Sequence, residues 1–303
     1  MKSAYAGFVK NSRITSTRTL PHVNFLKNTL SELYGIDQQI AYPTAFTFIR
    51  QLAINLRNAI TTKSAETQRI VYCWQYIHSL DFFSRMLSQH VGADKTAALY
   101  PLVYPVIQIA LGAVKLNPSA QFFALRFYVV EGLLRIARQT ETYIPLAPTL
   151  LDTLDSAIMK TPSSSKKSSQ TVLKPIEFQV SLRVPNTYLS GPSARVYRDQ
   201  ISAQVVSLLY QFFDLYALNP AFPELVLPPV TIVKKWLKKH GGETSGKTRH
   251  ALQALVEKLE EQARWVEERR AGMEFSPENL VRNVPVSGGD EGPLKKAKAK
   301  FQY

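Results

Sequence analysis

Residues 45–60 have the sequence AFTFIRQLAINLRNAI, and the spacing of their apolar side chains decides the expected secondary structure. Apolar residues recur there every three or four positions, which is the period of one face of an α-helix. They are Phe46, Ile49, Ala53, Leu56 and Ile60. The positions between them carry Arg50, Gln51, Asn55, Arg57 and Asn58. The stretch therefore predicts an amphipathic helix that buries the apolar row and exposes the polar side chains.

The same spacing recurs along most of the chain, with one row near the middle of the sequence and another in its last third. Their members are Phe122, Leu125, Val129, Leu133 and Ile136, and then Ile201, Val205, Leu208, Phe212 and Tyr216. Between about residues 43 and 160 we expect five helices, with starts roughly every 20 to 30 residues, as in helical-repeat proteins. The sequence thus predicts an all-α fold, an irregular α-solenoid of armadillo-like or HEAT-like helix pairs.

Composition divides the chain into four parts. Residues 1–160 form a helical-repeat part, and residues 161–174 form a flexible linker that is rich in Ser and Lys and has almost nothing to bury. Residues 175–272 form a second helical part, with helices expected near 193–218, 220–240 and 247–270. Residues 273–303 form a tail rich in Gly, Pro and Lys, which is expected to be disordered.

One segment of the second part departs from the helical period. Residues 176–184, IEFQVSLRV, alternate apolar and polar side chains, which is the period of an extended strand. Because the predicted fold supplies no second strand, we expect this segment to lie along another element or along a partner. The last predicted helix returns to the helical period and places Glu260 and Arg264 at the i,i+4 spacing of an ion pair.

Net charge favours polyanionic partners. The 303 residues include 37 Lys and Arg against 23 Asp and Glu, which gives a formal charge of +14. Such a balance suits RNA, DNA or acidic protein segments, and charge alone does not choose among them. The single cysteine, Cys73, excludes an internal disulfide and a multi-cysteine zinc site. The most apolar stretch, 100–114, is shorter than a bilayer span and holds two prolines, so no membrane crossing or secretory signal is expected.

The string GGETSGKT, residues 241–248, matches the phosphate-loop pattern of Gly, four residues and then Gly-Lys-Thr. In a nucleotide-binding loop, a buried strand enters and a helix leaves, so that backbone amides converge on the phosphates. Here the preceding residues, VKKWLKKH, read as an amphipathic helix that ends at glycine. We therefore interpret the string as a turn between helices, with Lys247 at the start of the second one, and keep a phosphate-loop NTPase as a minor alternative.

Other catalytic or ligand-binding patterns are missing from the sequence. The five histidines show no i,i+4 pair and no metal-ligand spacing with Cys, Asp or Glu. His78 lies beside the apolar face of a predicted helix, where a hydrogen-bonded structural histidine is the expected role. We predict no catalytic residue, no cofactor and no metal.

Two lysine clusters and one proline-bounded segment are the candidate contact sites. Lys234, Lys235, Lys238 and Lys239 crowd one predicted helix, where they either contact RNA or a partner or are simply solvated. The same helix begins with FPELVLPPV, residues 222–230, in which Phe222 and Glu224 are candidate partner contacts. Lys295, Lys296, Lys298 and Lys300 crowd the tail and are typical of a nuclear-import signal.

Several long peptides, in this order, resemble the nucleolar complex protein two family. Those between residues 49 and 112 are IRQLAINLRNA (49–59), YCWQYIHSLDFFSRML (72–87) and YPLVYPVIQIALG (100–112). The remainder are YIPLAPTLLDTLDS (143–156), KPIEFQVSLRV (174–184), VYRDQI (196–201) and FPELVLPPV (222–230). The resemblance covers roughly residues 5 to 270 and is specific, because the peptides are long and not repetitive.

The resemblance implies a helical-repeat scaffold that is not an enzyme. It would act in biogenesis of the large ribosomal subunit, in rRNA maturation and intranuclear transport, located in the nucleolus and nucleoplasm of the nucleus. Its expected partners are other nucleolar complex proteins, as a heterodimer, and pre-60S ribosomal particles, with rRNA and histones as further candidates. A transport receptor or a chromatin and histone-binding regulator of the same fold is the alternative. The long N-terminal part expected of the family does not precede the first motif, which a fragment would explain.

Overall fold

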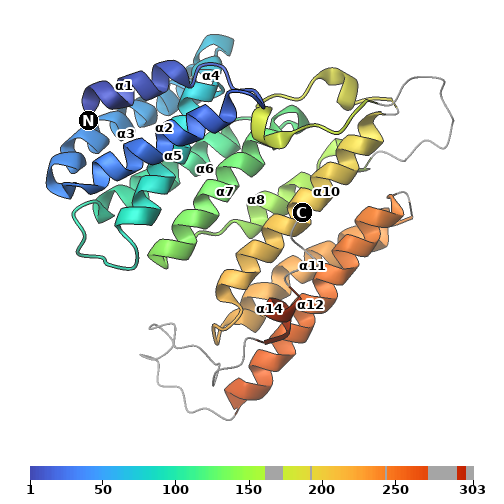
Figure 1. The fold of residues 1–303 in the computed structure, drawn as a ribbon. Coiled ribbons are helices and arrows are strands. Elements are labelled where there is room, and N and C mark those ends of the chain that lie inside the picture. Colours follow the sequence, from blue (N-terminus) through green and yellow to red (C-terminus); the bar gives the residue numbers. More distant parts are fainter. Residues whose placement is uncertain (161–172, 192, 243, 272–291, 298–303) are drawn as a thin grey trace. The chain divides into compact units, whose positions relative to one another are not determined.

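The computed structural model describes residues 1–160, 173–191, 193–242, 244–271 and 292–297. Throughout these ranges the chain is helix, turn or irregular coil, with no β-strand, which confirms the predicted all-α class (Figure 1). The helices gather into two compact units. Unit 1 consists of residues 1–144 and 177–184, and unit 2 takes the described residues within 145–176 and 185–303.

Unit 1 is built around α5 (Trp74–His90), which packs against α2 on one side and against α7 on another. The surrounding elements are α1 (Lys2–Asn11), α2 (Leu20–Gly35), α3 (Gln38–Thr62), α4 (Ala65–Val71), η1 (Tyr100–Leu102), α6 (Val103–Leu116), η2 (Ala120–Phe122), α7 (Phe123–Thr140) and η3 (Phe178–Val180). Asp37 caps α3, because its carboxylate accepts hydrogen bonds from the amides of Gln39 and Ile40. Ser64 caps α4 through the amide of Thr67.

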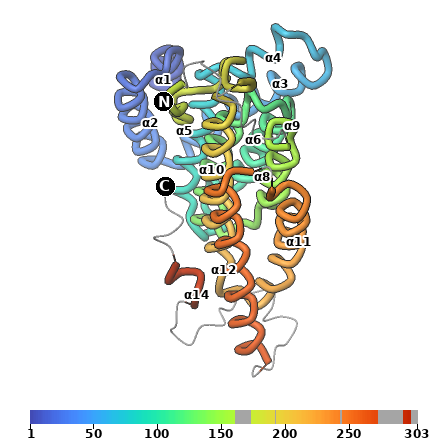
Figure 2. Tube along the Cα trace, turned by 90° about the vertical axis from the view of Figure 1, so that its right-hand side faces the viewer, coloured from blue at the N-terminus to red at the C-terminus, as the bar shows by residue number. Residues whose placement is uncertain are grey.

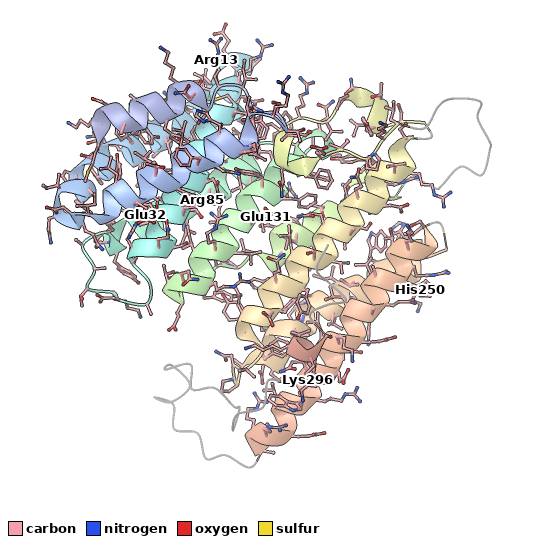
Figure 3. The ribbon with its side chains drawn as sticks, viewed as in Figure 1. Arg13, Glu32, Arg85, Glu131, His250 and Lys296 are labelled. Atoms are coloured by element: carbon pink, nitrogen blue, oxygen red, sulfur yellow. The ribbon has the colours of Figure 1, made fainter. Side chains whose placement is uncertain are left out.

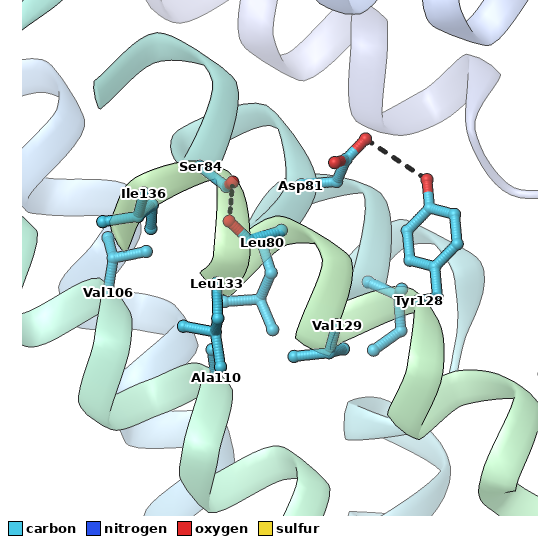
Figure 4. A pocket seen from close by; sticks show the side chains of 11 residues that line it. Leu80, Asp81, Ser84, Val106, Ala110, Tyr128, Val129, Leu133 and Ile136 are labelled. Carbon is cyan, nitrogen blue, oxygen red and sulfur yellow. Dashed lines mark hydrogen bonds between the residues drawn. The ribbon is translucent and has the colours of Figure 1, made fainter. Parts of the chain in front are cut away.

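α5 and α7 approach closely where a glycine faces a serine. The Ser84 hydroxyl donates to the carbonyl of Gly132 at 2.7 Å, and a Cβ on Gly132 would lie 3.3 Å from that hydroxyl oxygen (Figure 4). Around this contact the two helices bury apolar side chains that include Leu80, Val129 and Leu133. The predicted row along 125–136 is therefore core, as its spacing indicated, although Phe122 at its start is only half-buried.

The apolar row predicted for residues 46–60 is right in period but rotated toward solvent. Ile49 and Leu56 are buried as expected, whereas Phe46 and Ile60 are 46% and 48% exposed. The buried side of α3 instead includes Ala45, Leu52 and Ala59. The spacing alone could not show this, because α3 is apolar around more of its circumference than unit 1 covers.

Unit 2 is organised around three long helices, which confirms the three predicted after residue 190 (Figure 2). They are α10 (Ser193–Tyr216), α11 (Phe222–His240) and α12 (Gly246–Ala271), joined by the shorter elements α8 (Ala147–Leu154), α9 (Ala157–Lys160), η4 (Asn186–Tyr188) and α14 (Gly292–Lys296). α12 packs on both α10 and α11, and α8 packs on the same two helices. The indole N–H of Trp236 donates to the carbonyl of Leu154 at 2.9 Å and ties α11 to α8.

The unit boundary differs from the predicted one at residue 160. α8 and α9 belong with the C-terminal helices because α8 packs on α10 and α11. The predicted linker, 161–174, lies outside the described residues except for Leu173 and Lys174. The amide of Leu173 donates to the Ser193 hydroxyl at 3.1 Å, and the carbonyl of Lys174 accepts from the Tyr188 hydroxyl at 2.7 Å.

The strand predicted for residues 176–184 is wrong, since this segment contains the 3-10 turn η3 and no strand. Its alternation was nevertheless informative, because Leu182 and Val184 are buried while Arg183 between them is exposed. Within unit 1, the Phe178 ring packs on Phe127 at 5.6 Å and the amide of Val184 donates to the carbonyl of Gln121 at 2.8 Å. The segment thus lies along helical elements, which offer no ladder of hydrogen bonds.

Part of the tail that was expected to be disordered is packed on unit 2. Leu294 of α14 is fully buried, and its amide donates to Gln262 of α12 at 2.9 Å. The Tyr210 hydroxyl donates to the carbonyl of Leu294 at 3.0 Å. Leu294, next to the lysines, anchors this short stretch. The remainder of the predicted tail, 273–291 and 298–303, lies outside the described residues.

Candidate functional site

The four lysines of α11 form one exposed basic face. Lys234, Lys235, Lys238 and Lys239 are all exposed, while Val233 and Trp236 point into unit 2. The i, i+1, i+4, i+5 spacing of the lysines places them on the same side of the helix. We call this surface the α11 lysine face.

Only one of these lysines is engaged in an ion pair within the described part of the chain. Lys234 donates to the carboxylate of Glu260 on α12 at 2.5 Å, and both side chains are largely accessible. The predicted partner of Glu260, Arg264, instead directs its Nε toward the backbone carbonyl of residue 260. Lys235, Lys238 and Lys239 therefore remain available for anionic groups of another molecule.

The two other candidates on α11 lie in different environments. Phe222 is fully buried, with its ring edge against Phe213 at 6.3 Å, so it does not reach the surface of unit 2. Glu224 is exposed and paired with Arg270 at 2.6 Å. The large apolar residue that this segment exposes is Leu227, 67% accessible, next to the exposed Pro228, and the sequence analysis did not single it out. Partner contact by Glu224 stays a prediction, whereas the burial of Phe222 does not support a contact with a partner.

The tail lysines are only partly described. Lys295 is half-buried and Lys296 is exposed. Figure 3 labels Lys296 at the end of α14. Lys298 and Lys300 lie outside the described residues. The import signal therefore stays a prediction, and α14 places its first two lysines next to a buried anchor residue, Leu294.

The phosphate-loop string is a helix-to-helix connection in this structure. α11 ends at His240 and α12 begins at Gly246, so a helix and not a strand enters the string. The Ser245 hydroxyl caps α12 by accepting from the amide of Thr248 at 3.3 Å. Both hydroxyls also donate to the carboxylate of Asp199, at 2.5 Å from Ser245 and 3.3 Å from Thr248.

Asp199 makes this place unsuited to phosphate. A negative carboxylate lies next to the Ser and Thr hydroxyls and would repel a phosphate placed there. Lys247 is exposed and lies on a groove of about 760 Å³ between α10 and α12. Small apolar side chains, Ala203, Ala251 and Ala254, line part of the groove, and polar side chains that include Asp199 line the remainder.

A second polar feature, in unit 1, was missed by sequence reasoning. Asp81 on α5 is buried and accepts hydrogen bonds from three cations. Lys27 of α2 lies at 2.5 Å, Arg85 of α5 at 3.1 Å and Arg135 of α7 at 2.9 Å. The Tyr128 hydroxyl donates to the same carboxylate at 3.2 Å (Figure 4). We call these groups the Asp81 cluster.

Opposing effects set the charge of Asp81. Burial alone would raise the pKa of the carboxyl, but the charges of Lys27, Arg85 and Arg135 outweigh it and hold the pKa well below its usual range. Asp81 is therefore ionised at neutral pH. For Lys27, which has no exposed surface, burial lowers the pKa and Asp81 opposes that shift. The ion pairs of Asp81 join α5 to α2 through Lys27 and to α7 through Arg135, so the cluster holds the three helices together.

His78 completes the Asp81 cluster and confirms the expected structural role. Its Nε2 lies 2.8 Å from the Thr15 hydroxyl, and its Nδ1 lies 3.4 Å from the ammonium of Lys27. An ammonium can only donate, so Nδ1 is the acceptor and the ring proton sits on Nε2. Burial, followed by the charge of Lys27, lowers the pKa of His78 to about 3.

Acidification is expected to destabilise unit 1 through His78. Between the ordinary histidine pKa of about 6.5 and the folded value of about 3, the unfolded chain binds a proton that the folded chain does not. Stability therefore falls as pH drops through this window, by about 2 kcal/mol at about pH 5. Urea unfolding at about pH 7.5 and about pH 5 measures the loss. His78→Gln should remove most of it, and replacing the exposed His22 by Gln should leave it unchanged.

A polar hollow of about 120 Å³ lies beside the Asp81 cluster in unit 1. Arg85 and Glu131, which Figure 3 labels, line it together with Arg135 and with Gln179 from the segment after residue 176. Asp81 also lines the hollow, and its carboxylate is paired there with Arg85 and Arg135. Among the described residues no group of three or more His, Cys, Asp or Glu could hold a metal ion. Within the same ranges, every helix is too short or too polar to cross a bilayer.

The fold and these sites define the class of this protein, an all-α protein of packed helices with a basic helix face at its surface. The chain belongs to the Noc2p family, whose model matches residues 1–295. This confirms the resemblance seen in the sequence.

Relatives in three organisms cover most of the chain. A NOC2 family protein of Schizosaccharomyces pombe is 38% identical over 91% of the chain, and nucleolar complex protein 2 of Drosophila melanogaster is 34% identical over 89%. Nucleolar complex-associated protein 2 of Arabidopsis thaliana is 30% identical over 92%. The aligned region spans 38%, 33% and 35% of these three relatives, respectively.

Proposed function

We propose that this chain is a non-enzymatic helical scaffold in nucleolar ribosome biogenesis. Membership of the Noc2p family over residues 1–295 carries the proposal, since relatives in that family are named as nucleolar complex proteins. The specific role proposed is assembly and intranuclear transport of the large ribosomal subunit. The partners proposed are other nucleolar complex proteins and pre-ribosomal particles, in the nucleolus and nucleoplasm.

The α11 lysine face is the proposed contact with ribosomal RNA. Lys235, Lys238 and Lys239 are exposed, and unlike Lys234 they form no ion pair within the described residues. Lysines that neutralise phosphates release bound counterions, which gives affinity without requiring a base sequence. The formal charge of +14 adds a long-range attraction for the same polyanion.

Charge also weighs against the histone alternative for this surface. Histone tails are basic, so the α11 lysine face would repel them.

A nuclear location fits the lysines of α14, and an import signal there is part of the proposal. The charged side chains of the Asp81 cluster are paired with one another, which supports a structural role for this cluster.

Affinity purification of the full-length protein after ultraviolet crosslinking tests this function. We expect precursor rRNA of the large subunit to crosslink to the protein and to co-purify with nucleolar complex proteins. Depleting the protein should reduce the large subunit relative to the small one on sucrose gradients. Recovery of histones or import cargo without precursor rRNA would contradict the proposal and favour the regulator alternative.

A further inference from the structure

The outward side of α3 carries far more apolar surface than a solvent-facing helix needs. Five of the thirteen large apolar side chains exposed in the described parts of the chain lie within residues 36–60. They are Ile36 at 79%, Ile40 at 61%, Phe46 at 46%, Ile54 at 40% and Ile60 at 48% exposed. Single exposed apolar residues are ordinary, but a cluster along one helix marks a surface that another molecule covers.

Four of these side chains lie on the exposed side of α3, in two rows, and Ile36 lies just before the helix. Ile40 and Ile54 are fourteen residues apart, four helical turns, and so lie in the same row. Thr47 and Thr61 belong to the same row, because each lies seven residues after one of these isoleucines. Both threonines are exposed. Phe46 flanks the row on its other edge, where its ring stacks with Tyr42 at 6.2 Å. Phe46 and Ile60 form a second exposed apolar row. We call the exposed side of α3 that carries the two rows the α3 outer face.

Charge selects the kind of partner. Arg50 and Arg57 are exposed between the apolar rows, and the 25 residues of α3 contain no Asp or Glu. Asp37, just before the helix, is occupied in capping it. The α3 outer face is therefore apolar with two guanidinium groups and no compensating carboxylate of its own, which suits a ligand that supplies carboxylates.

Two other occupants fit less well. A second copy packed about a two-fold axis would place the arginines of one α3 outer face against those of the other, at a cost in repulsion. RNA is bound by stacking on aromatic side chains, whereas this surface is dominated by isoleucine. An amphipathic protein helix buries aliphatic side chains and can place Glu or Asp beside them.

We infer that the α3 outer face binds an amphipathic, acidic helix of another protein. The helix lies along α3 with its apolar side on Ile40 and Ile54 and its carboxylates on Arg50 and Arg57. The inference deepens the proposed scaffold function by naming a surface and a kind of protein partner, and it is independent of RNA contact by α11.

Site-specific photo-crosslinking in the full-length protein tests this inference. The probe p-benzoylphenylalanine replaces Ile54, crosslinks are formed in cells, and the crosslinked peptides are sequenced by mass spectrometry. We expect one peptide from another protein, with apolar residues at helical spacing and a net negative charge. Combining the probe with Arg50→Glu and Arg57→Glu should lower the yield of that crosslink at least about tenfold, since two charge-assisted contacts become repulsive.

Matched controls separate this surface from the rest of the chain. Lys235→Glu with Lys238→Glu makes the same charge change on α11 and should leave the crosslink at position 54 intact while lowering the recovery of RNA. The same probe at Thr231, exposed on α11, should not capture the acidic peptide. Crosslinks from position 54 to RNA, to this chain itself or to nothing would overturn the inference, and circular dichroism verifies that each variant is folded. Precursor rRNA recovered in the same samples reports on the scaffold function separately.

Discussion

Replacing Asp81 by asparagine is expected to lower the free energy of unfolding by about 3–5 kcal/mol. The substitution keeps the size of the side chain but removes the one carboxylate among the described residues that Lys27 contacts, at 2.5 Å. Lys27 has no exposed surface, so its ammonium cannot recover the lost interaction by turning to water. A buried cation without a counter-charge is among the costliest defects that a single substitution can create.

Urea unfolding, followed by circular dichroism and tryptophan fluorescence, measures this loss. Trp74 reports on unit 1 because its ring stacks on His78 at 5.0 Å. As a control, Asp152→Asn on the exposed side of α8 should change the stability by no more than about 0.5 kcal/mol. Adding Lys27→Met to Asp81→Asn should recover part of the loss, because the Asp81 cluster then holds no fully buried charge. A loss below about 1 kcal/mol for Asp81→Asn would mean that water reaches the ammonium.

Local patterns in the sequence predicted the helices well. The three long helices of unit 2 follow from apolar periodicity and from glycine at the end of α11, both of which depend on neighbouring residues. The rejection of the phosphate loop had the same local basis, since the lysine-rich segment before Gly241 has the period of a helix. The exposure of the four lysines on α11 also follows from spacing alone.

The predictions that failed concern features that depend on which elements pack against one another in space. The spacing of residues 46–60 identified a helix but not which part of its wide apolar arc unit 1 covers, so Phe46 and Ile60 were placed in the core. Period-two alternation after residue 175 identified the covered side chains, but a strand also needs a neighbouring strand, and the described chain supplies none.

The Asp81 cluster was missed because its members are far apart in the sequence. Lys27 and Arg135 lie on α2 and α7, and nothing in their local context points to a common carboxylate. One signal was present, since Asp81 interrupts the apolar run between Leu80 and Phe82. An acidic residue at an apolar position of a buried helix indicates a buried partner of opposite charge.

Removing the α11 lysine face is expected to weaken RNA binding by roughly 10- to 100-fold near physiological salt. The variant carries glutamine at positions 234, 235, 238 and 239, which keeps the length and helix preference of the side chains. Each lost phosphate contact should reduce the slope of log affinity against log salt by about 0.7 for single-stranded RNA. Because Lys234 is engaged with Glu260, three contacts are the minimum expected, and the slope should become shallower by about 2 or more.

Fluorescence anisotropy with a labelled single-stranded RNA at several salt concentrations measures both quantities. A matched control removes four exposed cations from unit 1 by Lys2→Gln, Lys10→Gln, Arg50→Gln and Arg57→Gln, so that its net charge equals that of the α11 variant. If RNA lies on the α11 lysine face, the α11 variant loses much more affinity and slope than the control, because condensed counterions are released only where phosphates touch. Equal losses in the two variants would show that net charge, and not this helix face, attracts the RNA.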